Sequence, residues 1–68
     1  MNPEQHIGET VGIIYTNKSG NIDKRTGIII TTTINKVAFL LLNDVEDEDV
    51  EIMIPMDKIK RICKPWEL

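Results

Sequence analysis

The side chains best suited to binding chemistry are basic and lie near the C-terminal end. Lys58, Lys60, Arg61 and Lys64 form a short cluster. Ammonium and guanidinium groups pair with phosphates, so this cluster could contact a nucleic-acid backbone. Few aromatic side chains accompany it for base stacking, and an overall pI near 4.9 disfavours non-specific nucleic-acid binding. We therefore favour a solvated strand edge guarded by lysines, with nucleic acid as the less favoured partner.

An acidic run precedes the basic cluster. Six carboxylates lie between Asp44 and Glu51, whereas the rest of the chain has eight Lys or Arg against five Asp or Glu. The charge pattern predicts a basic body with one acidic protrusion. The order Asp47-x-Asp49-x-Glu51 resembles the start of a calcium loop, but the glycine and the final glutamate of such a loop are missing. We expect a solvated hairpin tip here and no metal site.

Side chains for catalysis are scarce. His6 is the only histidine, Ser19 is the only serine, and Cys63 has no histidine near it in sequence. A nucleophile, a base and a group that orients the base cannot be assembled from these residues. The sequence predicts a non-catalytic protein without catalytic residues or a cofactor, in which Cys63 is a small buried apolar side chain.

The strongest signal for a protein partner is a stretch over residues 37–42 that is apolar on both faces. One face carries Val37, Phe39 and Leu41, and the other carries Ala38, Leu40 and Leu42. A barrel interior takes only one of these faces, so the other needs a cover. Either Trp66 folds across Leu40 and Leu42 or a second copy of the chain lies there, with association slightly favoured. We therefore expect a protein-binding surface at Ala38, Leu40, Leu42 and Trp66, and a homodimer is one form it could take.

The elements that must position these residues are strands. Period-2 alternation and β-branched composition predict strands over residues 11–16, 24–33, 37–42 and 50–54, and a last strand over 59–62. Gly27 suggests a bulge or bend. Pro55 ends the fourth strand, and residues 56–59 suit a single 3-10 turn. The pattern predicts an all-β, five-stranded SH3-like (Sm-like) small barrel. A five-stranded OB barrel is the rival, although it usually needs more residues and a helix after the third strand.

A chain of 68 residues makes one domain. We expect a flexible N-terminal arm over residues 1–8, in which Pro3 could open one helical turn, a barrel over residues 9–64 and a C-terminal tail over residues 65–68. Alternation predicts a core that includes Val11, Ile13, Ile28, Ile30, Phe39, Leu41, Ile52, Ile54, Ile59 and Ile62.

Cysteine usage and hydropathy favour a cytoplasmic location. The single Cys63 cannot form an internal disulfide, and a secreted domain this small usually needs several. No apolar run approaches the roughly 20 residues of a membrane helix, and the polar N-terminus does not have the pattern of a signal peptide. We expect no membrane partner.

Two short patterns suggest a family. Ile13, Tyr15, Gly20 and Arg25 can fill the places of a strand ending in tyrosine, a glycine turn and an arginine, and residues 56–59 (Met-Asp-Lys-Ile) match a closing Leu-Asp-Arg-Ile segment. This arrangement resembles the Sm/SH3-like WYL domains. The stretch from Gly27 to Ile62 is similar to the related YolD-like bacterial proteins. The resemblance covers roughly residues 11–62 and implies a small barrel with a regulatory role in sensing ligands or nucleic acid. The basic residue that WYL domains carry before the closing motif is missing from residues 52–55.

Two functions follow as expectations. The first is a non-catalytic interaction or regulatory module that acts through protein contacts. The alternative is a nucleic-acid-associated regulator of the WYL or YolD-like kind, which would use the basic cluster of Lys58, Lys60, Arg61 and Lys64.

Overall fold

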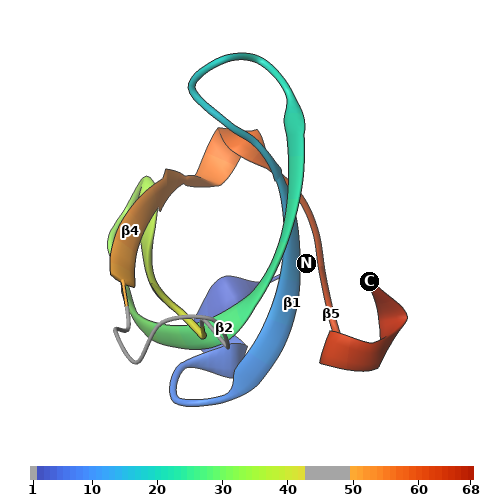
Figure 1. Ribbon diagram of the computed structural model, residues 1–68. Helices are drawn as coiled ribbons and strands as arrows, with labels where there is room; N and C mark the ends of the chain where they lie inside the picture. Colours follow the sequence, from blue (N-terminus) through green and yellow to red (C-terminus); the bar gives the residue numbers. More distant parts are fainter. Residues whose placement is uncertain (1, 43–49) are drawn as a thin grey trace.

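The computed structural model describes residues 2–42 and 50–68. Five antiparallel strands form one sheet in the order β4-β3-β2-β1-β5. They are β1 (Thr10–Thr16), β2 (Ile22–Thr32), β3 (Lys36–Leu41), β4 (Val50–Pro55) and β5 (Ile59–Cys63). The sheet curves around its inner face as a small barrel, and β4 and β5 are its two edge strands (Figure 1). The predicted five-stranded, all-β fold is confirmed.

Three short 3-10 helices complete the described residues, which contain no α-helix. These are η1 (Pro3–His6), η2 (Met56–Lys58) and η3 (Pro65–Glu67). Pro55 ends β4 because it has no N–H for the ladder, and η2 then leads directly into β5. The predicted 3-10 turn before the last strand is therefore confirmed. None of the helices in residues 2–42 and 50–68 is long and apolar enough to cross a membrane.

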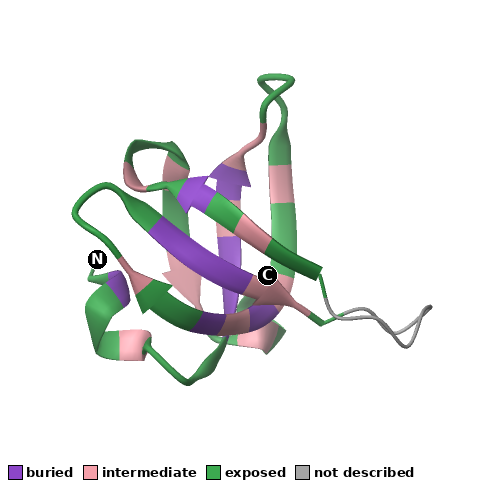
Figure 2. Cartoon of the chain, turned by 90° about the vertical axis from the view of Figure 1, so that its left-hand side faces the viewer, coloured by how far each residue is buried: buried purple, intermediate pink, exposed green. Residues whose placement is uncertain are grey.

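The buried side chains come mainly from the central strands, as Figure 2 shows. The buried apolar residues are Val11, Ile13, Tyr15, Ile29, Val37, Ala38, Phe39 and Ile54, and Leu41, Ile52, Met56, Ile59 and Ile62 pack against the core while partly buried. Most of the predicted core is present. Tyr15, Ile29, Val37 and Ala38 are additional buried residues, and β2 holds the main error.

In β2 the predicted core residues Ile28 and Ile30 are not the buried ones. Ile29 is fully buried, Ile28 is half-buried, and Ile30 is 41% exposed. Ile29 pairs with Phe39 and Thr31 pairs with Ala38, so Ile30 is an extra residue without a partner in β3. This is a β-bulge. The bulge that was predicted at Gly27 therefore lies three residues further along the strand.

A second bulge explains how β5 faces the core. Ile14 pairs with Arg61 and Tyr15 pairs with Ile59, so Lys60 has no partner in β1. In a regular strand, residues three apart point to opposite faces. The extra residue lets both Ile59 and Ile62 pack against the core, as predicted, and leaves Lys60 exposed.

Both ends of the chain contact the barrel. Pro3 is buried, and the Gly8 N–H donates to the Ile29 carbonyl over 2.7 Å, so the described part of the predicted arm is attached to β2. At the other end, η3 packs against β1. Leu68 lies over Gly12 so closely that a methyl group on Gly12 would be 2.6 Å from Leu68 Cγ.

Candidate functional site

A pocket of about 590 Å³ opens beside β4. Its walls come from the end of β1, the β1–β2 turn, the start of β3, β4 and η2. The lining residues are Tyr15, Thr16, Asn17, Lys18, Ser19, Lys36, Ile52, Met53, Ile54, Pro55 and Lys58. We call this site the lysine-rimmed pocket. Its volume is typical of ligand sites, which span roughly 300–1,000 Å³.

The pocket follows the free edge of β4. Four consecutive residues, 52–55, line it. Successive side chains of a strand point to opposite faces, so a pocket in contact with all four must lie along the strand's edge. The sheet order leaves that edge without a neighbouring strand.

The strand register identifies which backbone groups face this edge. Lys36 pairs with Pro55, and Ala38 pairs with Met53. Pro55 has no N–H, so Lys36 and Pro55 form a non-hydrogen-bonded pair. Hydrogen-bonded and non-hydrogen-bonded pairs alternate along two antiparallel strands. The Ala38–Met53 pair, two positions away, is therefore also a non-hydrogen-bonded pair. The N–H and C=O of Met53 thus point away from β3, toward the free edge, where another extended chain could pair with them.

One wall of the pocket is a turn held by Asn17. The Asn17 side-chain oxygen accepts from the N–H groups of Ser19 (2.9 Å) and Asn21 (3.0 Å). The turn also contains Gly20, whose φ of +84° suits glycine. These local bonds hold the backbone that carries Lys18 at the pocket.

Two hydrogen bonds at the β2–β3 turn hold the opposite wall of the pocket. The Lys36 N–H donates to Thr33 Oγ1 over 3.1 Å, and the Met56 N–H donates to the Asn35 carbonyl over 2.8 Å. The second bond ties η2, and therefore Lys58, to the β2–β3 turn. Lys36 and Lys58 thus come from segments far apart in sequence that the fold holds together at one rim.

The chemistry of the lining is apolar with a cationic rim. Met53 is 49% exposed, while Ile54 and Tyr15 form the buried part of the lining. Lys18 and the two lysines of the opposite wall are exposed, and no Asp or Glu of residues 2–42 and 50–68 belongs to the lining. Among described residues, the ion pairs involve none of these three lysines. Asp23 lies behind the lining, where it accepts from the Asn17 side-chain amide over 3.2 Å. The pocket thus combines apolar surface with three lysines at its rim.

Tyr15 contributes a pH-sensitive group to the pocket. Burial raises the pKa of the Tyr15 phenol above its ordinary value of 10.0, and the nearby Asp23 carboxylate raises it further, while Arg25 partly offsets these effects. Folded protein therefore keeps the phenol proton at a pH where the unfolded chain has lost it. This contribution to stability is complete below the unfolded pKa and is lost as pH rises through the folded pKa.

We expect Tyr15→Phe to weaken the loss of stability at alkaline pH. Urea denaturation of the parent and the variant between about pH 8 and about pH 11 measures the difference. The free energy of unfolding of the parent should fall more steeply than that of the variant above about pH 10, because only the parent loses the phenol proton. Parallel curves would show that the phenol does not couple to folding.

The predicted partner surface is not assembled as expected. Ala38 is buried at 3% exposure, because the larger side chains of Thr31 and Met53 flank it on the neighbouring strands. Leu42 is 41% exposed and Leu40 is half-buried. Ala38 is therefore wrong as an accessible contact residue.

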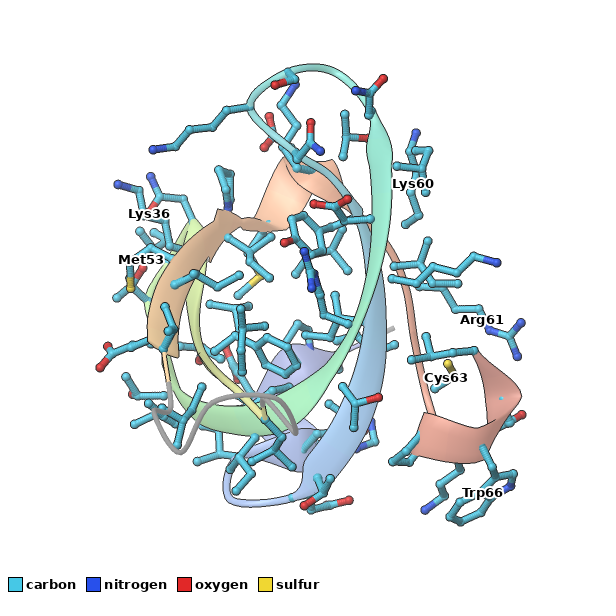
Figure 3. All side chains as sticks on the ribbon, viewed as in Figure 1. Lys36, Met53, Lys60, Arg61, Cys63 and Trp66 are labelled. Atoms are coloured by element: carbon cyan, nitrogen blue, oxygen red, sulfur yellow. The ribbon has the colours of Figure 1, made fainter. Side chains whose placement is uncertain are left out.

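The predicted placement of Trp66 across Leu40 and Leu42 is also wrong. Trp66 belongs to η3, which packs against β1, and it is 81% exposed. Figure 3 shows Trp66 on the β5 side of the barrel and Met53 of β4 on the opposite side. Pro65 starts η3 directly after β5, so the tail reaches only the nearest strand. The homodimer predicted for this face stays a prediction.

The predicted basic cluster is divided in the structure. Lys58 lines the lysine-rimmed pocket, whereas the other three residues do not. Lys60 and Arg61 project from β5 on the side away from Met53 (Figure 3). The Glu67 carboxylate offsets part of this charge, because it lies 3.6 Å from Arg61 Nη2. The same carboxylate accepts a hydrogen bond from the backbone N–H of Lys64 over 3.0 Å.

The residues considered and set aside for metal binding or catalysis lie apart from the pocket or outside the described residues. Asp47 and Asp49 lie outside the described residues, and Glu51 is exposed on β4. Cys63 is half-buried on β5 rather than fully buried. His6 lies 3.4 Å from a Glu9 carboxylate oxygen in an exposed contact near the N-terminus.

The comparisons with known proteins give no relative for this chain. No family model matches it, and neither the curated proteins nor the solved structures contain a match. The lysine-rimmed pocket and the strand beside it are therefore the features that bear on function.

Proposed function

We propose that this chain is a non-catalytic interaction module that binds an extended segment of a partner protein along β4, in the lysine-rimmed pocket. The observation that carries the proposal is the free edge of β4, where the backbone groups of Met53 face a pocket of about 590 Å³. Edge strands can accept an extended peptide as an added strand, with main-chain hydrogen bonds for affinity and side-chain pockets for specificity.

The apolar part of the lining supports a peptide with at least one apolar side chain. Met53 is half-exposed, and methionine is flexible enough to adapt to different side chains. Tyr15 is the only aromatic residue in the lining, whereas grooves for proline-rich peptides are lined by several aromatics. The pocket therefore suits a β-strand better than a polyproline helix.

The test is a selection of random peptides against the full chain. Peptides that bind should lose at least about tenfold in affinity when Met53→Glu replaces the apolar contact at the edge by a negative charge. Ile34→Glu is the matched control, because Ile34 is 99% exposed in the β2–β3 turn and does not line the pocket. Bound peptide should also slow hydrogen exchange at the Met53 amide. Failure to select any peptide, or equal binding to both variants, would contradict the proposal.

The second candidate is a nucleic-acid-associated regulator of the WYL or YolD-like kind. Exposed Lys60 and Lys64 on the β5 side support it. Glu67 next to Arg61 weakens it, because that carboxylate offsets part of the charge that phosphates would need. We place the peptide-binding function first for this reason.

A cytoplasmic location is part of the proposal, since Cys63 is a free thiol.

A further inference from the structure

We infer that the segment bound in the lysine-rimmed pocket is acidic, with carboxylate side chains on either side of an apolar one. This inference rests on the proposed function, because it assigns the chemistry of the ligand for the same pocket. The occupant is a partner protein, and its acidic strand pairs with the edge of β4.

The positive charge of the lysine-rimmed pocket comes from three separate segments of the chain. Lys18, Lys36 and Lys58 come from the β1–β2 turn, the start of β3 and η2, and the fold brings all three to one pocket. The chain as a whole has a net charge of −3. Among the residues that the structure describes, the lining has three lysines and no carboxylate, which is the reverse of the overall charge. A local field of this sign attracts anionic groups.

Lysines lie on two sides of Met53 in the pocket. The turn that carries Lys18 forms one wall, and Lys36 lies beside Pro55 in the register on the other side. Figure 3 shows Lys36 and Met53 on the same side of the barrel. Alternate residues of an added strand point to the same face about 7 Å apart. Lys36 and Met53 point to the same face of the sheet, because Lys36 pairs with Pro55, two residues from Met53. An apolar side chain of the added strand can therefore contact Met53 while carboxylates two residues before and after it reach the rim.

The pocket is poorly suited to nucleic acids, the other common anionic partners. Single-stranded nucleic acids bind where aromatic rings stack on the bases. The only aromatic ring in the lining is Tyr15, which is 9% exposed and so offers little surface for stacking. The unpaired backbone of β4 also offers hydrogen bonds that an extended peptide fits. Both features favour an acidic peptide over an oligonucleotide.

The experiment compares two labelled peptides by fluorescence anisotropy. The acidic probe has the sequence Gly-Thr-Glu-Thr-Leu-Thr-Glu-Thr-Gly, which puts the two Glu and the Leu on one face of a strand, and its neutral counterpart has Gln in place of every Glu. We expect the parent chain to bind the acidic probe about tenfold more tightly than the neutral one at low salt. The preference should shrink between about 50 mM and about 200 mM salt, because the lysines are exposed.

Two triple variants separate the local rim from the overall charge. Lys18→Gln, Lys36→Gln and Lys58→Gln together should abolish the preference for the acidic probe. Lys24→Gln, Lys60→Gln and Lys64→Gln remove the same amount of charge from exposed residues outside the pocket and should leave the preference largely intact. Circular dichroism confirms that both variants are folded.

Each remaining outcome decides between the proposals. Equal binding of the two probes, with both lost in Met53→Glu, would overturn the acidic ligand and keep the peptide-binding function. If neither probe binds, the acidic ligand is wrong, and the peptide selection still decides the proposed function. Tighter binding of a nine-nucleotide oligothymidylate would favour nucleic acid and overturn the inference. Concentration-dependent self-association that the rim variant abolishes would make a second copy the occupant instead of a partner protein.

Discussion

Replacing Phe39 by alanine is expected to unfold this protein at ordinary temperatures. Phe39 is fully buried and is the largest fully buried side chain. Removing a buried phenylalanine costs about 3–5 kcal/mol through lost burial and the cavity left behind. A domain of 68 residues has a total stability of only about 3–10 kcal/mol at roughly 0.05–0.15 kcal/mol per residue. The loss is therefore comparable to the whole stability.

Thermal denaturation followed by circular dichroism measures this effect. Ile34→Ala is the matched control, since Ile34 is 99% exposed and should melt like the parent. A soluble Phe39→Ala variant with the melting temperature of the parent would show that the ring does not hold the core together.

Gly27→Ala is expected to have the second large effect, because two strands approach each other closely at Gly27. A Cβ atom there would collide with the Leu40 carbonyl oxygen and lie 2.8 Å from Phe39 Cζ. Gly27 pairs with Leu41 in the ladder, so the carbonyl cannot move without disturbing β2–β3 pairing. Overpacking costs about 1–3 kcal/mol, and we expect the upper end of this range here.

Gly12→Ala is the comparison that isolates the cause. A methyl group on Gly12 would meet only the Leu68 side chain, at 2.6 Å. Leu68 is the C-terminal residue and can move away, so we expect a loss below about 1 kcal/mol in urea denaturation. Equal losses in the two variants would mean that the general cost of replacing glycine, rather than the Leu40 carbonyl, determines the effect.

The peptide-binding proposal and the stability predictions concern different parts of the barrel. Phe39 and Gly27 lie where β2 and β3 pair, whereas the lysine-rimmed pocket follows the opposite edge of β4. Met53→Glu changes a half-exposed side chain on an edge strand, so its effect on peptide binding can be measured in a folded protein. Ligand binding and folding can therefore be tested separately.

Little of the candidate site could be predicted from the sequence. Of the predicted contact residues, only Lys58 lines the pocket. The sequence did not mark Lys18 or Lys36 as contact residues, because each is an ordinary polar residue next to a turn. Their common place in the pocket depends on the curvature of the sheet, which brings the β1–β2 turn close to β4. Trp66 was misplaced for the converse reason, since its large side chain says nothing about which strand the tail reaches.

The sequence by itself determined the strands, the turns and the 3-10 step, because these depend on local alternation and on proline and glycine. Pro55 ends β4, and Val11, Ile13 and Tyr15 recur at every second residue, so these strands were recognisable alone. Only the tertiary structure decided which of Ile28, Ile29 and Ile30 enters the core. Three equal side chains contain no periodic signal, and the bulge opposite β3 shifts the register by one residue. The pocket was decided in the same way, because it depends on which segments meet once the sheet has curved.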